Sequence, residues 1–170
     1  MRVRSMLKLG AVAASVLLIA SCSKTPGSAD LDGSSAQGLG KLQHFAGQQE
    51  GEMYTTQAPH NQVYRFAYDD SALASKYVPS VNAQADYLKS HPGARILLAG
   101  NTDERGSREY NIALGEHRAN TVAEIIRMAG VSDNQLRVVS YGKERPANLG
   151  HDDESHAQNR RVELTFEATK

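Results

Sequence analysis

The stretch that decides the fold is RILLAGNTDERGSREYNIALGEHRANTVAEIIRMAG, residues 95–130. Its first six residues, 95–100, form an apolar run that ends in glycine, which predicts a buried strand. A polar loop follows over 101–108. Apolar residues then recur at alternating steps of three and four, which predicts a helix over 109–129 that Gly130 terminates. Strand, polar loop and long helix therefore form one unit.

Patterned segments on both sides extend this unit into one α/β domain. Upstream, alternating residues predict a strand over 63–68, and helical spacing predicts a helix over roughly 71–90. Pro79 indicates an irregularity or a late start in that helix. The downstream elements are a strand, a short helix and a strand over 135–141, 155–159 and 161–167. The order β-α-β-α-β-(α)-β predicts an α/β (α+β) two-layer sandwich, with helices packed on one mixed four-stranded sheet.

Residues 1–21 have the layout of a secretory signal peptide. Three basic residues precede the uncharged run 9–20, which is shorter than the about 20 apolar residues of a membrane-spanning helix. The only cysteine, Cys22, lies at the cleavage point in the sequence LIASC. A lone cysteine excludes a disulfide framework and a cysteine-based zinc site within the chain.

The segment after the cysteine is predicted to be a flexible tether. It is rich in Gly, Ser, Ala and Gln, and its apolar residues show no sustained period, so it lacks the means to form a core. We place the tether, with the cysteine at its start, at 22–55 and the folded domain at 56–170. Leu39, Leu42 and Phe45 also allow a short amphipathic turn that docks on a partner.

The charge balance excludes one class of partner. The full chain carries 19 Lys and Arg against 19 Asp and Glu. Loss of Arg2, Arg4 and Lys8 with the signal peptide leaves 16 basic groups against 19 acidic ones, a net charge of −3. A nucleic-acid-binding protein needs a concentrated basic surface, so no nucleic-acid partner is expected.

Short motifs along the patterned region resemble the OmpA C-terminal-like domain family. They are TDERGS at 102–107, YN at 110–111, Leu114, RA at 118–119, YG at 141–142 and NRRV at 159–162. Three more motifs resemble the peptidoglycan-associated lipoprotein (Pal) branch of that family, which belongs to the Tol–Pal system. They are GNTDERG at 100–106, GKERP at 142–146 and LGHD at 149–152. Asn101 and Ala67 depart from the family pattern, and we expect them to tune the rim of a site there.

The resemblance covers about 63–168, and LIASC resembles a bacterial lipobox. It implies that Cys22 carries an N-acyl diacylglycerol, the only attached group expected, and that Ser23 favours export to the outer membrane of a Gram-negative bacterium. The domain would then face the periplasm. The implied function is to anchor the outer membrane to the cell wall during cell division and so maintain envelope integrity. The implied partners are peptidoglycan, outer-membrane lipid and the periplasmic propeller protein of the Tol system.

Gram-negative peptidoglycan carries meso-diaminopimelate, whose free end is a zwitterion with an ammonium and a carboxylate on one carbon. Asp103, in the loop after the buried strand, can accept hydrogen bonds from the ammonium, and Arg118, on the long helix, can grip the carboxylate with its fork. Their spacing places Asn111 and Leu114 on the same helix edge as Arg118. The resemblance adds contacts from Tyr68 and Asp69. The predicted site is therefore Asp103, Arg118, Asn111, Leu114, Tyr68 and Asp69.

Several charged residues also have a purely structural interpretation. Asp103 can be a turn residue, and Arg118 a solvated helix charge. Glu104 with Arg105 is interpreted as a loop ion pair. Of the two arginines at 160–161, one is expected to pack over the sheet and pair with an acid.

The acidic and histidine run 151–156 is interpreted as a polar loop that caps the short helix, and no metal site is expected there because adjacent acids fix no coordination geometry. No zinc triad, serine elbow or pair of separated catalytic carboxylates is evident, so the sequence predicts a binding protein and not an enzyme. Two alternatives stay open, a protein-interaction scaffold whose main ligand is the propeller protein and a wall hydrolase.

Overall fold

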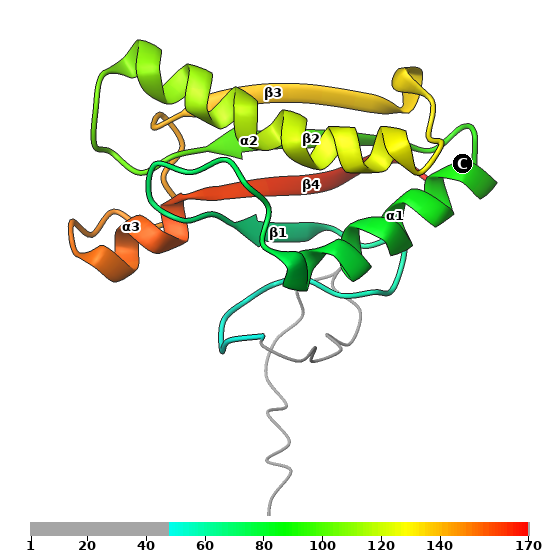
Figure 1. The fold of residues 1–170 in the computed structure, drawn as a ribbon, viewed down its shortest axis with the longest axis horizontal. Coiled ribbons are helices and arrows are strands. Elements are labelled where there is room, and N and C mark those ends of the chain that lie inside the picture. The colour runs from blue at the N-terminus through cyan, green and yellow to red at the C-terminus, as the bar shows by residue number, and fades with distance from the viewer. Residues whose placement is uncertain (1–47, 170) are drawn as a thin grey trace, which may run out of the picture. The chain divides into compact units, whose positions relative to one another are not determined.

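Figure 1 shows the fold in the computed structural model, which describes residues 48–169. The elements are β1 (Gln62–Arg65), α1 (Val78–Ser90), β2 (Arg95–Asn101), α2 (Arg108–Met128), β3 (Leu136–Gly142), α3 (Asp153–Asn159) and β4 (Arg161–Ala168). Short 3₁₀ turns precede α1 and β3, at Ser75–Tyr77 and Asp133–Gln135. This order confirms the predicted succession of elements. The predicted signal peptide, Cys22 and most of the tether lie outside the described residues.

The strands form one mixed sheet in the order β1-β4-β2-β3. The last strand in sequence, β4, lies inside the sheet and pairs antiparallel with both β1 and β2. β2 and β3 pair in parallel, so the chain must cross over between them, and α2 is that crossover. Helices α1 and α2 lie on one face of the sheet (Figure 1), which confirms the predicted two-layer arrangement.

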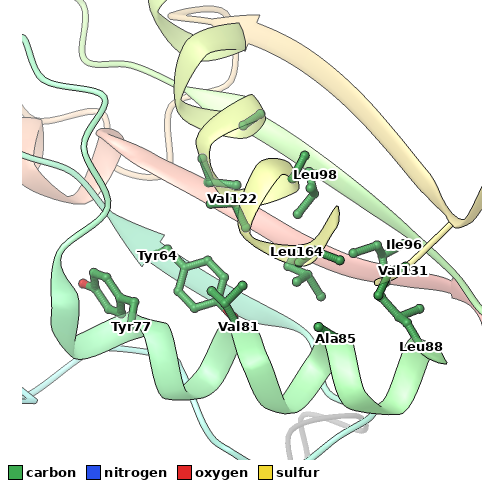
Figure 2. Packing of buried hydrophobic residues seen from close by; sticks show 14 of the residues in the cluster. Tyr64, Tyr77, Val81, Ala85, Leu88, Ile96, Leu98, Val122, Val131 and Leu164 are labelled. Atoms are coloured by element: carbon green, nitrogen blue, oxygen red, sulfur yellow. The ribbon is translucent and has the colours of Figure 1, made fainter. Parts of the chain in front are cut away.

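The core lies between these two helices and the sheet. Figure 2 shows Val81 of α1 and Val122 of α2 beside Leu98 and Leu164 of the central strands, and all four are fully buried. The aromatic ring of Tyr64 fills the space under the start of α1. Burial of each such side chain contributes about 1.5–3 kcal/mol to the stability of the fold. The helix–sheet interface therefore holds the domain together.

Helix α1 begins later than the predicted residue 71. Pro79 lies in its first turn, where a missing N–H removes no hydrogen bond, and Tyr77 is the N-cap residue. Residues 71–74 are irregular, and Asp70 accepts a hydrogen bond from the Ala72 N–H at 2.8 Å. The proline therefore marks the true start of the helix, as the sequence indicated.

Strand β1 is shorter than the predicted 63–68. Arg65 pairs with Arg161, the first residue of β4, and the Phe66 N–H donates a last hydrogen bond to the Arg160 carbonyl at 2.9 Å. Because β4 offers no partner beyond that point, the chain leaves the sheet at Ala67. Tyr68 is therefore 61% exposed and does not continue the buried face that Tyr64 begins.

The folded domain begins before residue 56, so the predicted end of the tether at residue 55 is too late. Tyr54 is fully buried, and its ring packs edge-on against Tyr77 with centroids 4.7 Å apart. Glu52 accepts hydrogen bonds from the Tyr77 hydroxyl at 2.8 Å and the Lys76 ammonium at 2.7 Å. The Thr55 N–H donates to the Gln62 side chain at 2.7 Å. Residues 52–55, just before β1, thus contribute to the folded domain.

Two glycines set the distance between α2 and β2. A Cβ atom on Gly100 would lie 1.8 Å from the Gly115 carbonyl oxygen, so only glycine lets the helix backbone approach this closely. Next to this contact, the Ser140 hydroxyl of β3 donates to the Ile112 carbonyl of α2 at 2.7 Å. The first turns of α2 are thereby held directly over the ends of β2 and β3, where the polar loop begins.

Candidate functional site

A small pocket of about 70 Å³ lies at this end of the sheet. Four parts of the chain form it: the irregular stretch after β1, the loop after β2, the first turns of α2, and Arg160 just before β4. Its lining residues are Tyr68, Asp69, Thr102, Asp103, Arg105, Gly106, Tyr110, Asn111, Leu114, Arg118 and Arg160. The structure therefore brings all six residues of the predicted site together around one pocket.

Arg118 is the most buried charged group of the pocket, with no exposed surface. Its guanidinium donates to three backbone carbonyls, those of Ala67 at 3.0 Å, Asp70 at 2.8 Å and Asn101 at 3.1 Å. Burial, and then the nearby positive charge of Arg160, lower the pKa of Arg118 to about 10, so it is still charged at neutral pH. The interpretation of Arg118 as a solvated helix charge is wrong.

Asp103 is buried beside two arginines. Its Oδ2 accepts from Arg105 Nη2 at 2.6 Å and from Arg160 Nη1 at 3.2 Å, and its Oδ1 accepts from the Arg105 N–H at 3.2 Å. Burial by itself raises the pKa of Asp103, but the hydrogen bonds from Arg105 and then Arg160 outweigh it, so the pKa lies below its ordinary value. The carboxylate is therefore a stable anion at the pocket floor.

The stretch after β1 forms one wall of the pocket. Asp69 has a φ of +53°, which turns the chain sharply back toward α2, and the Tyr110 hydroxyl donates to its carboxylate. The Arg105 guanidinium lies over the Tyr68 ring, 4.1 Å from the centroid. Tyr68 and Tyr110 are both exposed, so two aromatic rings form the rim.

Asn111 supports the loop that carries Asp103. Its side-chain amide donates to the carbonyls of Arg105 at 2.8 Å and Ser107 at 2.9 Å. The Ser107 hydroxyl in turn accepts from the Tyr110 N–H at 3.1 Å and caps α2. Asn111 is almost fully buried, so it fixes the loop backbone as well as lining the pocket.

The expected Glu104–Arg105 ion pair does not form. Arg105 bonds to Asp103, whereas Glu104 accepts from His151 Nδ1 at 2.8 Å and from His156 Nε2 at 3.2 Å. The Arg105 N–H also donates to Asp103 Oδ1, which is the local turn that an aspartate makes with the residue two positions on. This turn chemistry at Asp103 is the signal in the sequence that would have placed Arg105 in the pocket.

The two arginines at the start of β4 divide their roles. Arg161 pairs with Glu163 at 2.5 Å on the sheet, which confirms the expectation for one of them. Arg160 instead enters the pocket, held by a hydrogen bond from its Nε to the Phe66 carbonyl at 3.1 Å. Its role depends on the pairing of β1 with β4, which a single sequence does not reveal.

Asp152 caps α3 by accepting from the Ser155 N–H at 2.8 Å, as the polar-loop interpretation predicted.

Asn101 and Ala67, which depart from the family pattern, contact Arg118 of the site through their backbone carbonyls. Their carbonyls are two of the three that hold Arg118, and neither side chain lines the pocket. Asn101 is itself buried, and its side-chain amide donates to the Ala99 carbonyl at 3.0 Å. A change of side chain at these positions therefore leaves the contacts to Arg118 available.

The pocket presents a fixed cation beside a fixed anion in a partly desolvated hollow, an arrangement complementary to a zwitterion. Across residues 48–169, no group of three His, Cys, Asp or Glu side chains is placed to hold a metal ion. In the same part of the chain, none of the helices has both the length and the apolar character needed to cross a membrane.

Comparisons with known proteins agree with this fold. The OmpA family model matches residues 65–160, which include every residue of the pocket. A peptidoglycan-associated lipoprotein of Legionella pneumophila is 71% identical over 176 aligned positions that cover 100% of both chains. One from Haemophilus influenzae is 40% identical, with 96% of this chain and 97% of its own covered.

Solved structures show the same fold. The crystal structure of the peptidoglycan-associated lipoprotein from Burkholderia pseudomallei has 47% identity and a TM-score of 0.61, and the match covers 62% of this chain and 89% of that one. The C-terminal domain of Helicobacter pylori MotB has 25% identity and a TM-score of 0.57, with 63% and 84% covered. On its sequence and its fold, the chain belongs to the OmpA family and, within it, to the peptidoglycan-associated lipoproteins.

Proposed function

We propose that this lipoprotein binds peptidoglycan by taking the free zwitterionic end of diaminopimelate into the pocket between Asp103 and Arg118. The observation that carries the proposal is this buried pair of opposite charges at one small opening. The ligand carboxylate would meet Arg118, and the ligand ammonium would meet Asp103. The names of the relatives, peptidoglycan-associated lipoprotein, support the wall as the source of the ligand.

The hydrogen-bond capacity of Arg118 supports its proposed role. A guanidinium has five N–H donors, and three of those of Arg118 go to backbone carbonyls, so its two Nη atoms each keep one donor for a carboxylate. Because those carbonyls already fix the side chain, binding a ligand freezes little further rotamer freedom. A pre-positioned guanidinium of this kind is well suited to recognise a carboxylate.

The size of the pocket supports a polymer end as the ligand. About 70 Å³ is well below the roughly 300–1,000 Å³ of pockets that enclose a drug-sized molecule. The pocket therefore suits the tip of one side chain, with the rest of the molecule outside. Weak binding of single tips suffices for an anchor, because many copies act together on one extended wall.

The state of the pocket acids supports binding and not catalysis. A general acid needs a pKa raised toward neutrality, whereas that of Asp103 is lowered. The other pocket acid, Asp69, is hydrogen-bonded to Tyr110. We therefore infer a noncovalent anchor and not a wall hydrolase.

The envelope context completes the proposal. We propose that Cys22, with its N-acyl diacylglycerol, holds the chain in the outer membrane and that the folded domain faces the periplasm. There it would act in the Tol–Pal system during cell division and maintain envelope integrity. Membership in the peptidoglycan-associated lipoproteins supports the envelope placement, and the sequence LIASC supports the lipid anchor. The proposed role in the Tol–Pal system rests on the resemblance to that family.

A second role as a protein-interaction scaffold is favoured by the rim of the pocket. Tyr68 and Tyr110 are 61% and 50% exposed, and tyrosine is enriched at protein interfaces. A docked protein, for which we propose the Tol propeller protein, would cover the same opening as the wall. Wall binding and protein binding should therefore compete.

A pull-down with purified wall sacculi tests the proposed function. The chain from residue 22 onward, carrying Cys22→Ser to keep it free of lipid, is compared with its Asp103→Asn and Asp86→Asn variants. Asp86 is exposed and pairs with Lys89, so it is a matched control for the loss of one carboxylate. We expect Asp103→Asn to lose most of the fraction bound to sacculi, while Asp86→Asn keeps it. Free meso-diaminopimelate should displace the variants that still bind. Undiminished binding by folded Asp103→Asn would place the wall contact elsewhere.

A further inference from the structure

The carboxylate that the proposed ligand needs is already occupied in the free protein. Arg105 Nη2 lies 2.6 Å from Asp103 Oδ2, a charge-assisted contact of the kind that a ligand ammonium would make. The Arg105 guanidinium also covers the Tyr68 ring, 4.1 Å from its centroid. Arg105 therefore fills part of the pocket as an internal cation.

Of the three arginines around the pocket, Arg105 is held most loosely. Arg118 is fully buried on three carbonyls. Arg160 is 14% exposed and is tied to the Phe66 carbonyl as well as to Asp103. The Arg105 side chain is 38% exposed, and its guanidinium donates only to Asp103.

One more contact is missing at Arg105. Its Nε lies buried and, within residues 48–169, has no hydrogen-bond partner. A buried donor without a partner is unfavourable, and this cost is relieved when the side chain swings into water. In its position beside Asp103, Arg105 thus gains a favourable ion pair but leaves one hydrogen-bond donor without a partner.

The loop backbone around Arg105 is fixed, so the side chain can move alone. The Arg105 carbonyl accepts from Asn111 Nδ2 at 2.8 Å, and the Gly106 carbonyl accepts from Lys143 Nζ at 2.7 Å. Rotation of the Arg105 side chain toward solvent leaves both bonds in place. Asp103 would then keep Arg160 and gain room for another cation.

We infer that Arg105 is an internal latch, which occupies the ammonium position of the pocket in the free protein and must leave when a zwitterionic ligand binds. This inference rests on the proposed diaminopimelate site and adds to it a competitor built into the chain. The latch lowers the affinity for the wall by the fraction of molecules in which it is open. While the domain is off the wall, Arg105 adds to Arg160 in balancing the buried charge of Asp103.

The test is calorimetric titration of the chain from residue 22 onward, with Cys22→Ser, using free meso-diaminopimelate as the probe. If the latch is open in about a tenth of the molecules, Arg105→Gln should bind about tenfold more tightly than the unaltered pocket. Arg108→Gln is the matched control, because Arg108 is three residues away, 70% exposed and paired with Glu144 outside the pocket. We expect its affinity to change less than twofold.

A second readout follows the latch itself. In an NMR spectrum of the arginine Nε–H groups, added ligand should move the Arg105 signal toward the position of a solvated arginine, with the Arg108 signal unchanged. Equal or weaker binding by Arg105→Gln, or an Arg105 signal that does not respond, would overturn the latch. In those cases the proposed function survives if the unaltered pocket binds and Asp103→Asn does not. Absence of binding by all variants would overturn both.

Discussion

At the scale of single residues, Arg118 has two tasks that one side chain rarely combines. It is fully buried, and its hydrogen bonds join the end of β2 to the irregular stretch after β1. It also lines the pocket, where we propose that it receives the ligand carboxylate. Substitution of Arg118 should therefore destabilise the fold as well as alter the pocket.

Arg118→Lys is predicted to lower the free energy of unfolding by about 2 kcal/mol. A lysine keeps the charge, but it lacks the planar fork that reaches three carbonyls, so buried acceptors lose their partner. Urea unfolding measures the change, and Arg127→Lys is the control because Arg127 is 39% exposed and pairs with exposed Asp133. A loss below 0.5 kcal/mol, on the order expected of surface substitutions, would contradict this account of Arg118.

Asp103 predicts a specific dependence of stability on pH. Its pKa in the folded protein lies below the ordinary 3.8, so its contribution is complete above that value and is lost as the pH falls through the lowered pKa. The difference in unfolding free energy between the unaltered chain and Asp103→Asn should therefore be constant from pH 7 to about 5 and shrink below pH 3.8. Urea unfolding across this range measures it, and a difference that stays constant to pH 2.5 would be the contrary result.

At the scale of elements, the site depends on how closely α2 lies on the sheet. Gly100 of β2 and Gly115 of α2 are in backbone contact, and this contact places the first turns of α2 over the loop with Asp103. The pocket is thus built mainly by one strand–loop–helix unit, and the stretch after β1 together with Arg160 completes it.

Gly100→Ala is predicted to destabilise the domain by at least about 3 kcal/mol, because the new Cβ would lie 1.8 Å from the Gly115 carbonyl oxygen and α2 would have to shift. Thermal or urea unfolding measures the change. Glu116→Ala, at an exposed position of the same helix, should change stability by less than about 0.5 kcal/mol. Native-like stability of Gly100→Ala would show that the two elements do not pack this closely.

The sequence predicted the elements and the six site residues because periodicity and motifs are local signals. What it missed depends on long-range pairing. Arg160 reaches the pocket only because β4 pairs with β1, and Tyr68 leaves the sheet only because β4 offers no residue to pair with it. The partner of Arg105 was missed for a local reason, because the turn between the Asp103 side chain and the Arg105 N–H brings these two residues together.

At the scale of the whole molecule, the folded domain includes residues that were expected in the tether. Tyr54 is fully buried against Tyr77, and Glu52 bonds to the same tyrosine. Residues 52–55, just before β1, are thus part of the folded domain.

Tyr54→Ala is predicted to lower the unfolding free energy by about 3 kcal/mol, the lower end of the range for deleting a buried aromatic ring. Met53→Ala is the control, because Met53 is the neighbouring residue and is 41% exposed. Urea unfolding of the chain from residue 22 onward measures both. Equal, small losses for the two variants would mean that the domain does begin near residue 56.

Altering the ligand tests whether the pocket recognises the zwitterionic end of diaminopimelate. Calorimetric titration would compare three stem tripeptides: one with a free diaminopimelate end, one acetylated on its ammonium group, and one amidated on the adjacent carboxylate. We expect the first peptide to bind and both modified peptides to lose binding, because Asp103 or Arg118 then lacks its charged partner. Equal binding of all three peptides would show that the pocket does not recognise these two charges.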